Sequence, residues 1–114
     1  MTSREERIAR NEALHREVNE RMRQIEEGLT AKGIVERREL DEYLCECGVD
    51  GCMETILMSA AEYEAVRSSP IRFAVRPEHV IPDVERVVEK HDRFVSVEKL
   101  VGEQAIARQT DPRS

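Results

Sequence analysis

Three cysteines within eight positions constrain this chain more than any other feature of its sequence. Cys45, Cys47 and Cys52 follow the spacing C-x-C-x4-C, with Gly48 and Gly51 between them. These glycines allow the tight turn and positive φ that would bring Cys52 back beside the other two sulfurs. Because the count is odd and a reducing compartment is expected, a disulfide framework is disfavoured. We predict a strand end followed by a loop on which the three thiols converge.

Converging thiolates indicate a metal site, and zinc takes four soft or borderline ligands in a tetrahedron. The fourth ligand is expected to be a histidine. His79 ranks first because it lies in a loop bracketed by Pro77 and Pro82. His91, in a charged turn, ranks second, and His15, on a helix, ranks third. Inert buried thiols and a redox-active group are the alternatives to a metal. The predicted zinc ligands are Cys45, Cys47, Cys52 and His79.

A catalytic zinc would keep one coordination position open and place a general base, such as Glu46 or Glu78, nearby. The sequence has no His-Glu-x-x-His motif, no deaminase-type combination of histidine and paired cysteines, and no glycine-rich phosphate loop. Four cysteines usually hold an iron–sulfur cluster, and the chain has three. A structural zinc is therefore favoured over a catalytic one and over an iron–sulfur cluster.

The N-terminal segment, residues 1–32, is predicted to form one long amphipathic helix. It contains no proline, and its apolar side chains recur at helical spacing within a stripe about 120° wide. With Asn11 and His15 included, the stripe also fits heptads, so self-pairing as a coiled coil and packing on its own domain are both open. The apolar members of the stripe are Ile8, Leu14, Val18, Met22, Ile25 and Leu29.

Residues 33–101 are predicted to form a small α+β zinc-binding domain. Strands are expected over residues 40–46, 54–58 and 71–75, and two more antiparallel strands within 84–100. Ser59 and Glu62 have the spacing of a capping box, which predicts a short helix up to about Arg67. Residues 102–114 are polar and are expected to be a flexible tail. The predicted fold class is α+β: a long helix and a small antiparallel sheet with one short helix, stapled by zinc.

Composition and charge limit the partners. Hydrophobic residues make up 39% of the 114 residues and there is no tryptophan, so the core should be small and a metal would help to stabilise it. The net charge of −6, without a basic stripe, makes nucleic acid an unexpected partner. The sequence lacks a long apolar run and the apolar core of a signal peptide, so we expect a cytoplasmic protein with no membrane contact.

The Cys-Glu-Cys-Gly-x-x-x-Cys segment, together with a helical N-terminus, resembles a family of small uncharacterised bacterial proteins. The resemblance spans roughly residues 8–100. Similar sequences carry Pro-Gly-His-Glu where this chain has Pro-Glu-His-Val at residues 77–80, so the histidine is kept. The resemblance implies a defined domain and no particular activity. The stretches that carry it are residues 44–52, 63–67, 70–75, 77–79, 87–89 and 97–99.

These features predict a small non-enzymatic zinc-binding regulatory or adaptor protein. The long helix would contact a protein partner or a second copy of the chain. The first alternative is a redox thiol switch, in which oxidation of the cysteines releases zinc. The second alternative is a zinc-dependent hydrolase, which requires an open coordination position.

Overall fold

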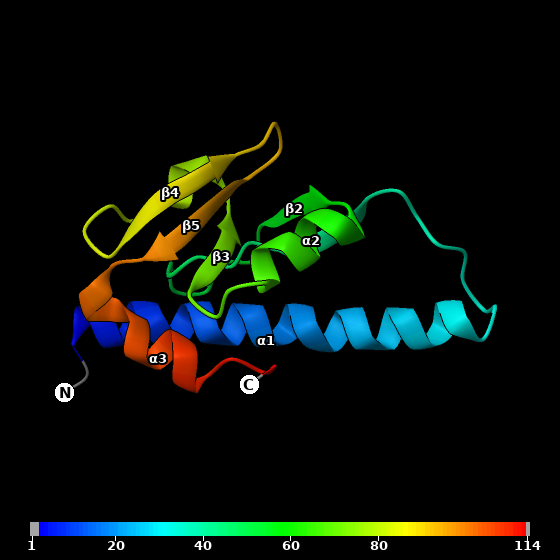
Figure 1. Cartoon of the computed structure of the whole chain (residues 1–114), viewed down its shortest axis with the longest axis horizontal. Helices are drawn as coiled ribbons and strands as arrows, with labels where there is room; N and C mark the ends of the chain where they lie inside the picture. Colours follow the sequence, from blue (N-terminus) through cyan, green and yellow to red (C-terminus); the bar gives the residue numbers. More distant parts are fainter. Residues whose placement is uncertain (1–2, 114) are drawn as a thin grey trace.

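Helix α1 (Arg4–Ala31) is the longest element of the structure, a computed structural model that describes residues 3–113. The Ser3 side chain caps it by accepting a hydrogen bond from the Glu6 N–H at 3.1 Å. Just past its end, Gly33 adopts a φ of 73°, the left-handed conformation that commonly follows a helix. The predicted single helix is confirmed, although residues 1 and 2 lie outside the described range. Figure 1 shows α1 running beneath the two sheets and α2.

The strands form two antiparallel sheets. Strand β1 (Asp41–Leu44) pairs with β2 (Thr55–Met58), and the other three strands have the order β3-β5-β4. The α+β class is confirmed, but the structure has two sheets where one was expected. The chain leaves β1 at Cys45 to enter the cysteine loop, and the Glu46 N–H then donates to Ala74 O at 2.9 Å, which connects the two sheets. The strands of the second sheet are β3 (Arg72–Val75), β4 (Glu85–Lys90) and β5 (Val95–Lys99).

Short helices connect and flank these sheets. Helix α2 (Ala60–Arg67) begins with the predicted capping box: Ser59 Oγ accepts from the Glu62 N–H at 3.1 Å, and Glu62 Oε1 accepts from the Ser59 N–H at 2.8 Å. The remaining helical segments are the 3-10 turns η1 (Pro77–His79) and η2 (Val101–Glu103), and α3 (Gln104–Gln109).

The face of α1 that packs on the body is mostly polar, so the alternative in which the apolar stripe packs on its own domain is wrong for most of the stripe. Leu14, Met22 and Ile25 are 56%, 48% and 64% exposed. Periodicity locates an apolar stripe but does not say which way it faces, and here polar side chains find partners in the body. The buried residues of α1 are Ile8, Ala9, Glu12, His15, Arg16, Asn19 and Glu20.

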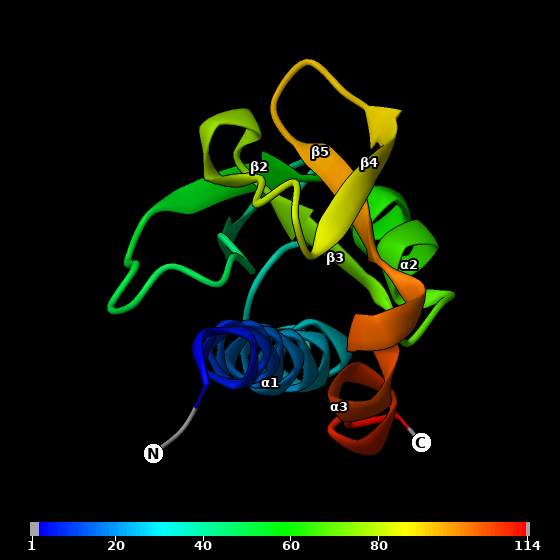
Figure 2. The same ribbon diagram turned by 90° about the vertical axis from the view of Figure 1, so that its left-hand side faces the viewer.

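Arg16 explains why the C-terminal segment, expected to be a flexible tail, is instead helical and packed on α1. Its guanidinium lies over the Phe73 ring, 4.5 Å from the centroid, and donates to Pro70 O at 2.6 Å and to Ala107 O at 2.8 Å. The last of these bonds fastens α3 to α1, and the two helices lie side by side in Figures 1 and 2. The polar sequence of this segment could not reveal that Arg16, 91 positions before Ala107, holds it against α1.

A second buried polar group joins α1 to the three-stranded sheet. Lys99 Nζ on β5 donates to Glu12 Oε1 at 2.7 Å and to Glu85 Oε1 at 3.4 Å. Burial, followed by the neighbouring Glu85, raises the pKa of the Glu12 carboxyl well above its usual range. Burial beside a second acidic group therefore favours the protonated form of the Glu12 carboxyl.

The side-chain amide of Asn19 joins α1 to the first sheet by pairing with the backbone of a β1 residue. Its amide donates to Leu44 O at 2.9 Å and its carbonyl accepts from the Leu44 N–H at 2.8 Å, as a neighbouring strand would. The same amide donates to the buried Glu46 carboxylate at 2.9 Å. One side chain thus satisfies three groups at the point where the cysteine segment begins.

Replacing Asn19 with alanine is expected to lower the free energy of unfolding by about 2–4 kcal/mol, because it leaves buried groups of Leu44 and Glu46 without a partner. Urea denaturation measures the difference. Gln24→Ala, on an exposed position of the same helix, should change stability by less than about 0.5 kcal/mol. A loss below about 1 kcal/mol for Asn19→Ala would show that the contact is not a main support of the fold.

Candidate metal centre

The structure brings the four predicted ligand residues together. The Sγ atoms of Cys45, Cys47 and Cys52 and a ring nitrogen of His79 all lie within 4.8 Å of one another. His79 Nδ1 is 3.4 Å from Cys45 Sγ and 3.8 Å from Cys52 Sγ. Around a tetrahedral zinc with its usual bond lengths, neighbouring ligand atoms are about 3.5–3.8 Å apart. The cluster is therefore compatible with a metal ion held by three sulfurs and one nitrogen.

Three separate segments supply these side chains. Cys45 directly follows β1, Cys47 and Cys52 lie in the loop before β2, and His79 ends the 3-10 turn η1. The three thiols belong to a buried cluster that also contains Phe73 and Val75 of β3. The site thus lies where the first sheet, its loop and the second sheet meet.

The two glycines of the loop have different roles. Gly51 adopts a φ of 67°, as predicted for the turn that returns the chain to Cys52. Gly48 does not have a positive φ; instead it lies against α1, where an added Cβ would approach Ile8 Cγ2 to 2.4 Å. Glycine is required at 48 because a side chain there would push the loop off the helix.

Polar side chains of α1 form hydrogen bonds with the same cysteine loop. His15 Nδ1 lies 2.7 Å from Cys47 O, and the Asn11 amide donates to Gly48 O at 3.0 Å and to Asp50 Oδ1 at 2.5 Å. With Asn19, these residues recur every four positions and so form one row along the helix. The sequence pattern contained this signal, since Asn11 and His15 interrupt the apolar stripe, but it did not reveal that they bind the cysteine loop.

Burial and hydrogen bonds shift the pKa values of Cys47 and Cys52. The Arg76 N–H donates to Cys45 Sγ at 3.3 Å. A hydrogen bond with Cys45, and then burial, raises the pKa of the Cys47 thiol to about 11, while the His15 side chain and then the Val49 N–H oppose this rise. Burial likewise raises the pKa of Cys52, against the N–H of Glu54. Without a metal these two thiols stay protonated at neutral pH, so metal binding would release protons and strengthen as pH rises.

Glu54 orients the histidine. Its Oε2 atom lies 3.0 Å from His79 Nε2 and 3.6 Å from Arg76 Nε. With Nε2 donating its proton to Glu54, the lone pair of Nδ1 faces the sulfurs, which is the usual arrangement of a carboxylate behind a metal-binding histidine. Sequence reasoning missed Glu54, although it lies only two positions after Cys52.

Of the other candidate groups, His15 contacts both the backbone and the side chain of Cys47, whereas His91 and Glu46 are engaged by other partners. His91 stacks on Phe94 with ring centroids 4.3 Å apart and lies 3.2 Å from Glu89 Oε2. Glu46 is fully buried, but its carboxylate accepts hydrogen bonds from Asn19 and from the Ala74 N–H. The cluster of Glu54, Glu78 and His79 shares its imidazole with the cysteine site and is more exposed. The Glu46 carboxylate is thus held by its own hydrogen bonds, and the exposed Glu78 carboxylate pairs with Arg76 at 3.6 Å.

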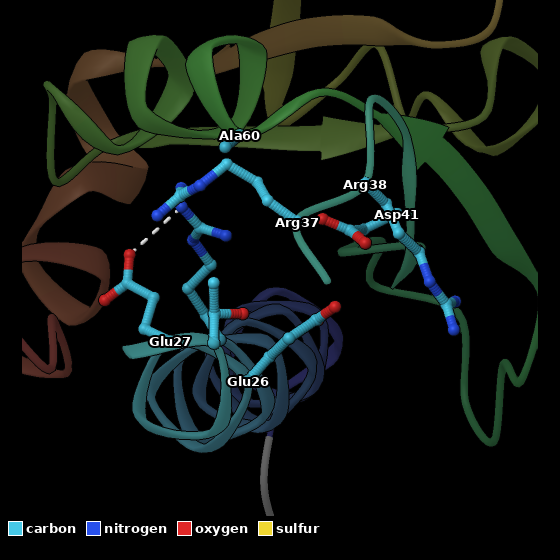
Figure 3. Close-up of a pocket in the computed structure, with 8 residues that line it drawn as sticks. Glu26, Glu27, Arg37, Arg38, Asp41 and Ala60 are labelled. Atoms are coloured by element: carbon cyan, nitrogen blue, oxygen red, sulfur yellow. Dashed lines mark ion pairs between the residues drawn. The ribbon is translucent and has the colours of Figure 1, made fainter. Parts of the chain in front are cut away.

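A charged cleft beside the C-terminal half of α1 offers no alternative ligand site. Figure 3 shows Glu26 and Glu27 on the helix facing the segment that carries Arg37, Arg38 and Asp41. Its free volume is about 20 Å³, enough for roughly one water molecule. Acidic and basic groups face each other across it, and Arg23 pairs with Glu27 at 3.0 Å. The cleft is thus too small for a ligand and is lined by charged groups of both signs.

Comparison with protein-family models, with curated proteins and with solved structures yields no match to this chain. The family resemblance of the cysteine segment therefore stays a prediction. None of the helices in residues 3–113 combines the length and apolar character needed to cross a bilayer.

Glu54→Gln is expected to weaken metal binding ten- to a hundredfold, because the neutral amide polarises and orients His79 less well than a carboxylate. Competition of a chromophoric chelator for the metal measures the affinity. Glu36→Gln is the matched control, because Glu36 is exposed and belongs to neither group of possible ligands. Equal affinities for the two variants would contradict the orienting role of Glu54.

Proposed function

We propose that the centre binds a structural zinc ion and that the protein is a small non-enzymatic adaptor. The observation that carries this proposal is the set of donor atoms, three sulfurs and one imidazole nitrogen within 4.8 Å of one another. Thiolate and imidazole ligands in a tetrahedral arrangement favour zinc over harder cations such as magnesium and calcium. Zinc would connect the end of β1, the cysteine loop and η1, three segments that a small core stabilises weakly.

The completeness of the donor set argues for a structural role. Four protein ligands fill a tetrahedron and leave no position for a water molecule, which a zinc hydrolase needs. The redox alternative is also less well supported, since Cys45, Cys47 and Cys52 are only 0%, 0% and 8% exposed, whereas redox-sensing cysteines are generally accessible to their oxidant.

The adaptor role follows from the outer face of α1. Leu14, Val18, Met22 and Ile25 form an apolar strip that the body does not cover; three of the four side chains are about half exposed or more. Contiguous exposed apolar surface of this kind typically marks a protein-binding site. The zinc-stapled body would then hold the helix in place and present this strip.

Purified without added metal, the protein is expected to contain about one equivalent of zinc per chain. Cys47→Ser should abolish zinc binding, because one of the four ligands is lost. Ser68→Ala, at an exposed position that is not a ligand, should retain one equivalent of zinc. Elemental analysis by mass spectrometry measures both. Zinc-free wild-type protein that is folded and binds no added zinc would refute the metal assignment.

The adaptor role makes a separate prediction. Val18→Glu and Ile25→Glu should change either the mass of the protein in solution or the set of proteins it retains in a pull-down, because each places a charge in the apolar strip. Gln24→Glu adds the same charge at a position outside the strip and should change neither. If both strip variants behave as the wild type while retaining zinc, the helix is not an interaction surface.

A further inference from the structure

The apolar strip of α1 borders a groove that the cysteine loop completes. On the helix side the groove is lined by Leu14, Val18 and Met22, and on the other side by Leu44 and Met53. Its volume is about 460 Å³, and Met53 is 81% exposed at its rim. Figure 2, which looks along α1, shows α3 on one side of the helix and the loop before β2 on the other.

The apolar surface continues along the helix. A second hollow of about 310 Å³ begins at Met22 and extends over Ile25 and Leu29 to Val35. The 28 residues of α1 span about 42 Å, so the two hollows follow most of one long, straight face. An occupant that fits both is itself long and straight, as an α-helix is.

Opposite charges border the two sides of this strip. Arg10 and Arg21 are exposed and, at 100° per residue, lie beyond Leu14 on the edge that faces away from the body. Glu42 and Asp50, both exposed, lie on the opposite side, with β1 and the loop. Arg21 also pairs with Glu17 on its own helix at 3.0 Å, with both side chains largely in solvent.

The basic and acidic residues on the two sides of the strip also lie at matching heights, that is, at matching positions along the axis of α1. Asp50 accepts a hydrogen bond from Asn11, which places it level with Arg10. Leu44 is bonded to Asn19, and Asp41 contacts Glu26, so Glu42 on the strand between them is level with Arg21 to within about one helical turn. Each arginine therefore has an acidic residue across the strip at its own height.

We propose that the occupant of the groove is the α1 helix of a second copy of the chain, in a parallel pair with a twofold axis along the helices. Such an axis turns the arginine edge of each copy toward the acidic rim of the other without changing its height. Arg10 then meets the partner's Asp50, and Arg21 meets the partner's Glu42. The seam is formed by Leu14, Val18, Met22, Ile25 and Leu29.

The charge pattern favours the parallel arrangement over the antiparallel one. A twofold axis across the helices would turn the strips toward each other but bring arginine edge against arginine edge, which is unfavourable. The parallel arrangement also agrees with the three-and-four spacing of Val18, Met22, Ile25 and Leu29, which is typical of a coiled-coil seam. This inference rests on the proposed adaptor function, because it names the partner of the same face.

Sedimentation equilibrium of the zinc-loaded full chain tests the proposal, with charge reversal as the probe. Arg21→Glu and Glu42→Arg should each weaken the dimer by roughly tenfold or more, since each variant places like charges together twice in the dimer. The double variant restores unlike charges and should recover most of the wild-type affinity. Gln24→Glu should leave the dimer unchanged, and zinc content with circular dichroism should show that every variant is folded.

Three other outcomes would overturn the dimer proposal. A wild-type chain that stays monomeric up to high micromolar concentration overturns the proposal, as does a dimer whose affinity ignores both charge reversals or is not restored by the double variant. A monomeric chain that retains another protein, and loses it on Val18→Glu, overturns the dimer while leaving the adaptor function in place. Loss of the zinc assignment alone leaves the charge-reversal prediction unaffected.

Discussion

The grip of α1 on the cysteine segment is the interaction on which the rest of the structure depends. Asn11, His15 and Asn19 form one row of the helix and bind the backbone of residues 44–48, while Ile8 presses against Gly48. These contacts fix the path of the chain from β1 into the loop. Because the loop carries three thiols, the helix determines where the sulfurs lie before any metal is present.

This arrangement accounts for the polar inner face of α1. An apolar face could bury the same area but could not satisfy the backbone groups of a segment that has left its sheet at Cys45. The buried Glu46 joins the same network, because it accepts hydrogen bonds from Asn19 and from the backbone of β3. The helix, the loop and the second sheet are thus connected through hydrogen bonds of defined geometry, and Leu14, Met22 and Ile25 of α1 remain exposed on the outer face.

Much of the fold and part of the site could be predicted from the sequence because the signals are local. The capping box at Ser59, the proline-free helix and the short β-branched runs each depend on neighbouring residues. The grouping of Cys45, Cys47 and Cys52 with His79 followed from ligand chemistry. Burial of Arg16 and Lys99, the helix at residues 104–109 and the orienting role of Glu54 depend on partners distant in sequence or on the folded geometry, so patterns of spacing could not reveal them. Spacing patterns also could not reveal which side of α1 faces the body, because the periodicity is the same whichever way the helix is rotated about its axis.

The central claim is that the three thiols and His79 form a complete tetrahedral zinc site that needs no further ligand. X-ray absorption at the zinc edge, on protein purified without added metal, tests this most directly. We expect a shell of three sulfurs near 2.3 Å and one nitrogen near 2.0 Å, with no water. A shell with two sulfurs, or with an oxygen in place of the imidazole, would contradict it.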